Sequence, residues 1–110
     1  MLSVVQFEDV YADQPHRLPE RAQHTADHLA FLAGHGDEII AAGALRPFPD
    51  AMPTGGIWIL DVERQEVAEA FYKDEPFRKA GLRKSVRVIH WAKAYWSPAF
   101  TACMGASSIG

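Results

Sequence analysis

The chain has one cysteine among 110 residues, no excess of basic charge and no long apolar run. Because Cys103 has no second cysteine to pair with, an intramolecular disulfide is excluded. The formal net charge of −3 argues against a nucleic acid or an anionic membrane as partner. No apolar stretch approaches the ~20 residues that span a bilayer, and no charged-then-apolar leader opens the chain. We therefore expect a cytoplasmic protein that binds neither nucleic acid nor membrane.

Signatures of cofactor binding are also missing from the sequence. It contains no glycine-rich phosphate loop, no paired-cysteine metal motif and no lysine placed for a Schiff base. We therefore predict no cofactor. Basic residues do gather between positions 78 and 87, and we interpret them as a solvated face rather than an anion site: Arg78, Lys79, Arg83, Lys84 and Arg87.

The stretch 21–43 organises the rest of the chain. Its first half has helical periodicity and separates two kinds of chemistry. One edge of the expected helix carries the ionisable side chains of Arg21, His24 and His28. A neighbouring face, which we expect to pack on the core, carries Ala22, Ala26, Leu29, Ala30 and Ala33. Two imidazoles and a guanidinium exceed what packing requires, so function is sought along this edge.

Apolar and β-branched runs predict strands over 2–7, 38–45, 56–62 and 85–91. The first helix begins near Pro19, whose missing N–H needs no helical partner there, and ends at Gly34 or Gly36 in a left-handed cap. The second helix covers 63–72 and ends before Pro76. This βαββαβ order predicts a ferredoxin-like α+β fold, in which a four-stranded antiparallel sheet carries two helices on one face.

A sheet of this kind leaves its second face bare. A bare face that carries Val, Ile and Trp is poorly solvated, so we expect a homodimer that packs sheet against sheet or subunit against subunit. Trp58 is expected in the sheet or at this seam. A chain of 110 residues has room for one compact core, and we expect one domain.

Five segments, taken in order, resemble the YCII-related family. They are the strand ending in Phe7-Glu8-Asp9, the segment His28-Leu29-Ala30-Phe31-Leu32, the step Ala42-Gly43-Ala44-Leu45, the strand at Gly56, and Glu75-Pro76-Phe77-Arg78-Lys79-Ala80-Gly81-Leu82. Members are small dimeric proteins of ferredoxin-like fold, of the dimeric α+β barrel type. The resemblance covers residues 1–92 and leaves 93–110 as a C-terminal extension, partly ordered by packing on the domain or a partner subunit.

The resemblance implies a His/Asp pair that does acid–base chemistry on a small molecule, such as elimination of hydrogen chloride from a chlorinated hydroxyquinol. The family histidine corresponds best to His28, with His24 as a rival in register. The family acid immediately precedes a Pro-aromatic step. Glu75 occupies that position here, where the family has aspartate, and Asp74 one step earlier is the second candidate.

Residue chemistry supports an acid–base role without the family. Imidazole titrates near ~6.5, and a carboxylate on its other ring nitrogen fixes the tautomer and stabilises the imidazolium. Arg21, one helical turn before His24, can hold an acidic or phenolate-like group of a substrate. By the family resemblance, Phe77 and the backbone around Gly81 line the cleft.

Other interpretations stay open. The i, i+4 spacing of His24 and His28 also fits two metal ligands, but no HExxH context surrounds them and we predict no metal. A lyase or isomerase needs His28 and the acid within hydrogen-bond reach inside a pocket. A non-catalytic small-ligand-binding module or a dimeric accessory protein would lack one of these features. In the tail, residues 92–96 can begin a short helix that stops at Pro98, and Cys103 is not expected to be a nucleophile.

Overall fold

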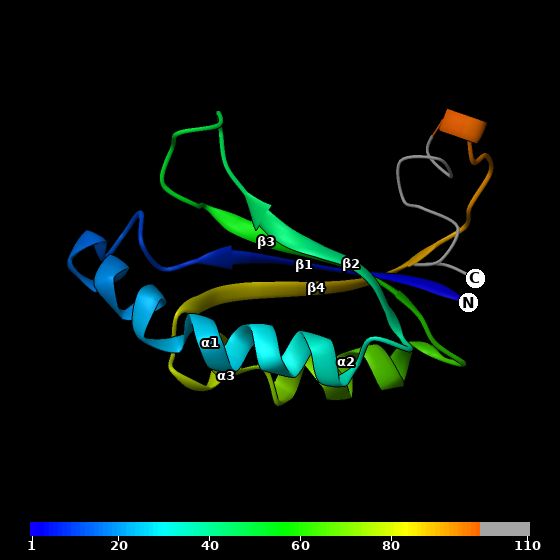
Figure 1. The fold of residues 1–110 in the computed structure, drawn as a ribbon, viewed down its shortest axis with the longest axis horizontal. Helices are drawn as coiled ribbons and strands as arrows, with labels where there is room; N and C mark the ends of the chain where they lie inside the picture. The colour runs from blue at the N-terminus through cyan, green and yellow to red at the C-terminus, as the bar shows by residue number, and fades with distance from the viewer. Residues whose placement is uncertain (100–110) are drawn as a thin grey trace.

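The computed structural model describes residues 1–99 and has the predicted elements in the predicted order, with two additional short helical segments (Figure 1). The strands are β1 (Leu2–Asp9), β2 (Ile39–Leu45), β3 (Gly55–Asp61) and β4 (Arg83–Trp91). The helices are the 3₁₀ helix η1 (Pro15–Arg17) and the α-helices α1 (Leu18–Gly34), α2 (Gln65–Lys73) and α3 (Pro76–Lys79). The strands form one antiparallel sheet in the order β2-β3-β1-β4, with α1 and α2 on the same face. The ferredoxin-like α+β fold is thus confirmed.

The core lies between this sheet and its helices. Side chains of β1 alternate between the two faces of the sheet, and Val5 and Phe7 are among those buried on the helix side. Trp58 of β3 pairs with Val5, so its ring points to the same side and packs edge-on against Phe7 at 6.0 Å. Of the two places expected for Trp58, the sheet and the dimer seam, the structure has the first, because the residue is 1% exposed within the single chain.

The helix α1 packs on the sheet with a different face from the one predicted. Its four alanines and Leu29 are exposed, whereas Phe31 and Leu32 pack against the core. Together with His28, these two residues form a stripe at helical spacing. Large side chains bury more apolar area than alanine does, so this stripe faces the sheet and the alanine face meets solvent.

The two long helices differ in how deeply they are buried. The 17-residue α1 has no fully buried residue, whereas the 9-residue α2 buries Ala68 and Tyr72 completely or nearly so. Both of these α2 residues belong to the main apolar cluster, with Val5 and Leu60. The sheet is therefore sealed under α2 and less tightly covered under α1.

The structure corrects the predicted ends of the helices. The residue after α1, His35, has φ of −114°, so the predicted left-handed cap is absent at this end. Within residues 1–99, Gly81 is the residue with positive φ, at +77°, and it follows α3 in the turn that leads to β4. Pro76 does more than limit α2, because it also opens α3.

A β-bulge offsets the pairing of β1 with β4. Phe7 pairs with Val86 and Glu8 with Ser85, but Asp9 pairs with Arg83, so Lys84 is skipped. A bulge of this kind changes the side to which the following side chains point. Arg83 consequently faces the helix side of the sheet together with Asp9.

The opposite face of the sheet carries apolar side chains that no helix within residues 1–99 covers. Val4 lies between Ile59 of β3 and Ile89 of β4, and Ile57 lies one pair further along. Ile89 is 40% exposed, and the other three are half-buried. These partly exposed apolar side chains are consistent with the predicted dimer, which stays a prediction.

The C-terminal segment departs from the expected helix. Residues 92–97 contain no helix, although the Trp96 ring lies 5.5 Å from that of Trp91 and the Lys93 Nζ atom lies 5.2 Å from the Trp96 ring. Helical residues begin only at Pro98, where the predicted helix was expected to stop, because proline suits the first turn of a helix. Residues 100–110, including Cys103, lie outside the described part of the chain. Among the residues described, no helix combines the length and the apolar character that crossing a membrane requires.

Candidate active site

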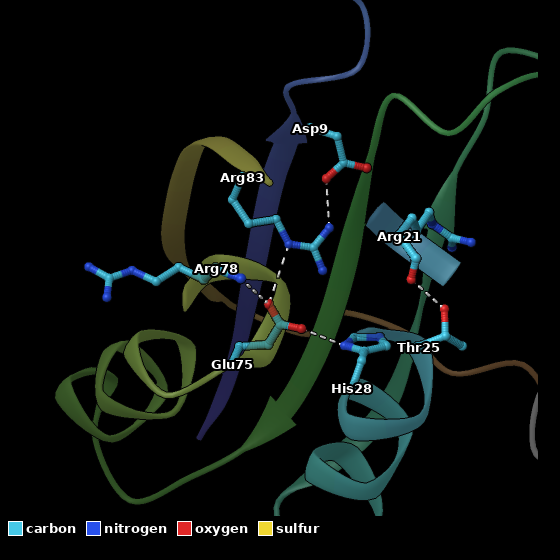
Figure 2. A network of polar contacts seen from close by, with 7 residues as sticks. All are labelled: Asp9, Arg21, Thr25, His28, Glu75, Arg78 and Arg83. Carbon is cyan, nitrogen blue, oxygen red and sulfur yellow. Dashed lines mark hydrogen bonds and ion pairs between the residues drawn. The ribbon is translucent and has the colours of Figure 1, made fainter. Parts of the chain in front are cut away.

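His28 of α1 and Glu75, which lies between α2 and α3, meet although they are far apart in sequence (Figure 2). The His28 Nδ1 atom lies 2.5 Å from the Glu75 Oε1 atom, and the side chains are 16% and 0% exposed. Because a carboxylate can only accept, Nδ1 carries the proton in this pair. The lone pair of the neutral ring is then on Nε2, which makes no hydrogen bond within residues 1–99.

Glu75 is also the N-cap residue of α3. Its Oε2 atom accepts a hydrogen bond of 2.9 Å from the backbone N–H of Arg78 and lies 3.5 Å from the Arg83 Nε atom. Burial alone raises the pKa of Glu75, but the His28 hydrogen bond, the Arg83 charge and the Arg78 N–H outweigh it, so its pKa lies below the usual value. Glu75 is therefore ionised at neutral pH.

Phe77 fixes the plane of the His28 imidazole. The two rings are stacked, with centroids 4.4 Å apart and planes inclined by 24°. Phe77 is held in turn by a second apolar cluster with Tyr11 and Leu82. The local sequence favours this arrangement, because the cap Glu75 followed by proline starts α3 and places the ring two residues later.

A cavity of about 220 Å³ lies between α1 and the sheet, beside His28. Small residues of β2 and β3, including Ala42, Ala44 and Gly55, line the sheet side and leave the space free. At Gly55 a Cβ atom would lie 2.0 Å from the Phe7 carbonyl oxygen, so this close approach of β1 and β3 requires glycine.

Arg21 lines the same cavity from α1. Its guanidinium carbon lies 5.9 Å from the centroid of the Phe77 ring. Its backbone oxygen accepts a hydrogen bond of 2.7 Å from the Thr25 hydroxyl, one turn along the helix. Within residues 1–99, the Arg21 guanidinium has no ion-pair partner.

Asp9 and Arg83 also line the cavity, and the sequence analysis missed both as site residues. The interpretation of Arg83 as part of a solvated face is wrong, because its side chain is 5% exposed and its Nη1 atom lies 2.6 Å from the Asp9 Oδ1 atom. Burial raises the pKa of Asp9, and the Arg83 hydrogen bond and charge oppose this only in part. The sequence gives no signal for either residue, because the bulge that turns Arg83 inward leaves no local pattern and Asp9 lies just beyond the strand predicted over 2–7.

Three of the predicted site residues lie apart from this group. Asp74 is exposed at the C-terminal end of α2, because the chain turns there and Glu75 caps α3. His24 is half-buried one turn before His28 and does not line the cavity. Gly81 does not line it either, and its carbonyl oxygen accepts a hydrogen bond of 3.1 Å from Arg17. Within residues 1–99, no three His, Cys, Asp or Glu side chains are grouped so as to hold a metal ion.

A histidine paired with a buried carboxylate, beside a cavity on a ferredoxin-like sheet, defines a class of small α+β proteins with a candidate acid–base site. Comparison with known families agrees with this class. The chain belongs to the YCII-related domain family, whose model matches residues 7–92. The family predicted from the five segments is thereby confirmed. Among curated proteins, none matches the chain in sequence.

A solved structure with the same fold is 5-chloro-2-hydroxyhydroquinone dehydrochlorinase (TftG) from Burkholderia phenoliruptrix AC1100, in complex with 2,5-dihydroxybenzoquinone. The two chains are 26% identical, and their superposition has a TM-score of 0.72. It covers 86% of this chain and 96% of the other, so the two chains share their fold over the superposed part.

Proposed function

We propose that this protein is a small-molecule enzyme of lyase or isomerase type, in which His28 is the general base and Glu75 orients it. The observation that carries the proposal is the 2.5 Å contact between His28 Nδ1 and Glu75 Oε1, made beside a cavity that His28 lines. Glu75 lies behind His28, a residue of the cavity wall, and a perturbed pKa such as that of Glu75 is common at functional sites.

The proposed role of His28 follows from its two ring nitrogens. The Nδ1–H group donates a hydrogen bond to Glu75, which leaves Nε2 free to accept a proton from a ligand in the cavity. The ionised Glu75 then stabilises the imidazolium that forms. Stacking on Phe77 holds the ring in one orientation, so Nε2 does not have to find its position during the reaction.

Arg21 is proposed to bind the anion that this proton transfer creates. The cavity already contains the pair of Asp9 and Arg83, and Glu75 pairs with protonated His28. An acidic O–H group that loses its proton to Nε2 would leave its oxyanion to Arg21, which lacks an ion-pair partner within residues 1–99. Every charge in the cleft is then paired, which favours a neutral, weakly acidic substrate.

The lyase alternative takes its support from the fold neighbour, whose name records a dehydrochlorination. In such a step one proton goes to Nε2 of His28, and the electrons released into the substrate expel chloride with the bonding pair of the C–Cl bond. An isomerase would use the same first step, and the proton would return from the imidazolium to a carbon atom of the substrate. Both reactions need one base and no cofactor.

The proposal includes a homodimer formed through the uncovered sheet face. Val4, Ile57, Ile59 and Ile89 give this face an apolar centre that a second copy of the sheet would match. Replacing Ile59 by Arg should yield monomers in sedimentation experiments, with Arg64→Glu on α2's exposed N-cap as a matched charge-changing control. Unchanged sedimentation of Ile59→Arg would exclude this seam.

Chloride release from 5-chloro-2-hydroxyhydroquinone tests the chemistry, together with deuterium exchange into the ring carbons of 2-hydroxyhydroquinone followed by NMR. We expect the wild-type protein to catalyse at least one reaction, His28→Ala to abolish it and His24→Ala, one turn away, to retain it. If the wild-type protein binds these compounds without either reaction, the cleft is a non-catalytic ligand-binding site. If it binds none of them, the accessory-protein interpretation is favoured.

A further inference from the structure

Asp9 and Arg83 form a buried pair that takes no direct part in the proposed proton transfer, to which Arg83 contributes only through its charge beside Glu75. Their side chains are 2% and 5% exposed, yet both line the cavity that holds His28. Burying two charges is expensive even when they are paired, and replacing such a pair by apolar residues is often neutral or stabilising. A purely structural role therefore explains their burial poorly.

The guanidinium of Arg83 is held rigidly. Its Nη1 atom donates to Asp9 Oδ1 at 2.6 Å, and its Cζ atom lies 3.7 Å from the centroid of the Phe7 ring and 4.9 Å from that of Phe77. Figure 2 shows Arg83 between Asp9 and Glu75, and Glu75 in turn lies between Arg83 and His28 of α1. A planar donor fixed in this way loses little entropy when it binds a ligand.

The pair also has hydrogen-bonding capacity to spare. Within residues 1–99, Nη2 of Arg83 and Oδ2 of Asp9 make no hydrogen bond, and Nε of Arg83 is buried without one. Nη2 can only donate and the carboxylate oxygen can only accept. Because Asp9 and Arg83 both line the cavity, these two atoms can offer one donor and one acceptor to a ligand edge on which one oxygen accepts and its neighbour donates.

We propose that Asp9 and Arg83 together bind a vicinal pair of oxygen substituents, the edge of a catechol-like ring, and so select the substrate of this cleft. One ring oxygen accepts from Arg83 Nη2, and the adjacent hydroxyl donates to Asp9 Oδ2. The inference rests on the proposed function in placing the ligand in the cavity beside His28. It adds the substrate class, because isomers without adjacent hydroxyls leave one buried group unpaired, which weakens binding.

Three isomeric benzenediols test this inference without any need for turnover. Catechol carries adjacent hydroxyls, whereas resorcinol and hydroquinone carry the same groups further apart. Dissociation constants come from anaerobic NMR titrations that follow the backbone amide shifts. For the wild-type protein we expect catechol to bind at least ~10-fold more tightly than hydroquinone, the discrimination of one lost good hydrogen bond.

Two conservative variants remove one half of the receptor each. Arg83→Lys keeps the charge beside Asp9 but replaces the planar guanidinium by a single ammonium group, so the second donating nitrogen is lost. Asp9→Asn replaces the carboxylate by a neutral amide, which has one accepting oxygen and one donating NH2 group. Both should lower the preference for catechol to near unity while their amide spectra stay folded. Arg64→Lys, on an exposed residue outside the cavity, is the matched control and should keep the full preference.

Several results would overturn the inference. A wild-type protein without a preference for catechol would exclude the ligand class, and a preference retained in both folded variants would exclude the two residues. His28→Ala separates this inference from the proposed function. That variant should keep the catechol preference while losing chloride release, and activity that survives in it would remove the proposed base but leave the receptor intact.

Discussion

The two halves of the helix-covered sheet face are built for different tasks. The half under α2 is closed, and Val5, Leu60 and Ala68 are there completely buried. The half under α1 contains a cavity of about 220 Å³ whose walls carry ionisable side chains, and α1 itself has no fully buried residue. The short helix α2 therefore contributes more buried residues to the core than the long helix α1 does, and α1 instead lines the candidate site. Four predictions test this division, in order of decreasing effect.

The largest effect should come from Trp58, which belongs to the closed core and also lines the cavity. Trp58→Ala removes a ring that is 1% exposed, so it should lower the free energy of unfolding by about 3–5 kcal/mol, as large-to-small core substitutions do. Urea unfolding followed by circular dichroism measures this. Tyr95→Ala, at a residue that is 75% exposed, is the control and should change stability little. Equal stability of the two variants would contradict the core assignment.

On the open side, His28→Ala should change activity far more than stability. Loss of the proposed general base should lower the rate of proton transfer by about 10²–10⁴-fold. Glu75 keeps Arg83 and the Arg78 N–H as partners, and alanine is a better helix former, so the unfolding free energy should fall by only about 1–3 kcal/mol, the contribution of one hydrogen bond to a charged group. Parallel rate and unfolding measurements decide the point. An unfolded His28→Ala protein would place this histidine among the structural residues.

Glu75 stands at the border of the two halves, so its substitution should affect both properties. Glu75→Gln keeps the shape but removes the charge that stabilises the imidazolium, and we expect a loss of about 10–10²-fold in kcat with a smaller change in KM. A fall in the melting temperature should accompany it, because Arg83 loses one of two carboxylates. Asp74→Asn, one residue earlier and exposed, provides the comparison. If the two variants have equal rates, Glu75 does not orient the base.

The smallest effect concerns pH and distinguishes the two carboxylates of the cleft. The pKa of Glu75 is lowered in the fold, so its ionisation contributes stability above its unfolded pKa of about 4.3, and this contribution is lost as pH falls through the folded pKa. The pKa of Asp9 is raised, so its contribution is present at low pH and is lost as pH rises through the folded pKa.

Unfolding free energies between pH 3 and pH 7 should therefore diverge for the two variants, a range chosen to bracket the ordinary carboxyl pKa values of about 4. The stability advantage of the wild-type protein over Glu75→Gln should grow as pH rises, and its advantage over Asp9→Asn should shrink. Slopes of the same sign would mean that Asp9 is ionised as readily as Glu75 is, against the effect of its burial.

Local patterns were sufficient to predict most of the fold. The apolar, β-branched runs of β1 and β3, the proline near the start of α1 and the order of elements all have a direct physical meaning in the chain itself. The orientation of α1 was not predictable in the same way. Its alanine face and its Phe31 and Leu32 stripe both have helical spacing, and the choice between them depends on which side chains fill the space above the sheet.

The site was only partly predictable for a similar reason. His28, Glu75 and Phe77 were found through the resemblance to a family, whose segments carry the pairing that the structure brings within contact distance. Asp9 and Arg83 belong to no such pattern in a single sequence. Their meeting depends on one irregular strand pairing, and strict alternation along β4 would have placed Lys84 opposite Asp9 instead.

The skipped residue in β4 has a consequence for how the chemistry of this cleft can change. The strand β4 has two possible registers opposite Asp9. The observed one presents the guanidinium of Arg83 to the cavity, and regular pairing would present the ammonium of Lys84. Lys84, set aside by the irregular pairing, instead holds Asp13 at 2.8 Å on the surface. A shift of a single residue between Gly81 and Ser85 would exchange a planar fork for a point charge with every other residue of the cleft unchanged. Spacing, as much as residue identity, encodes what this molecule can recognise.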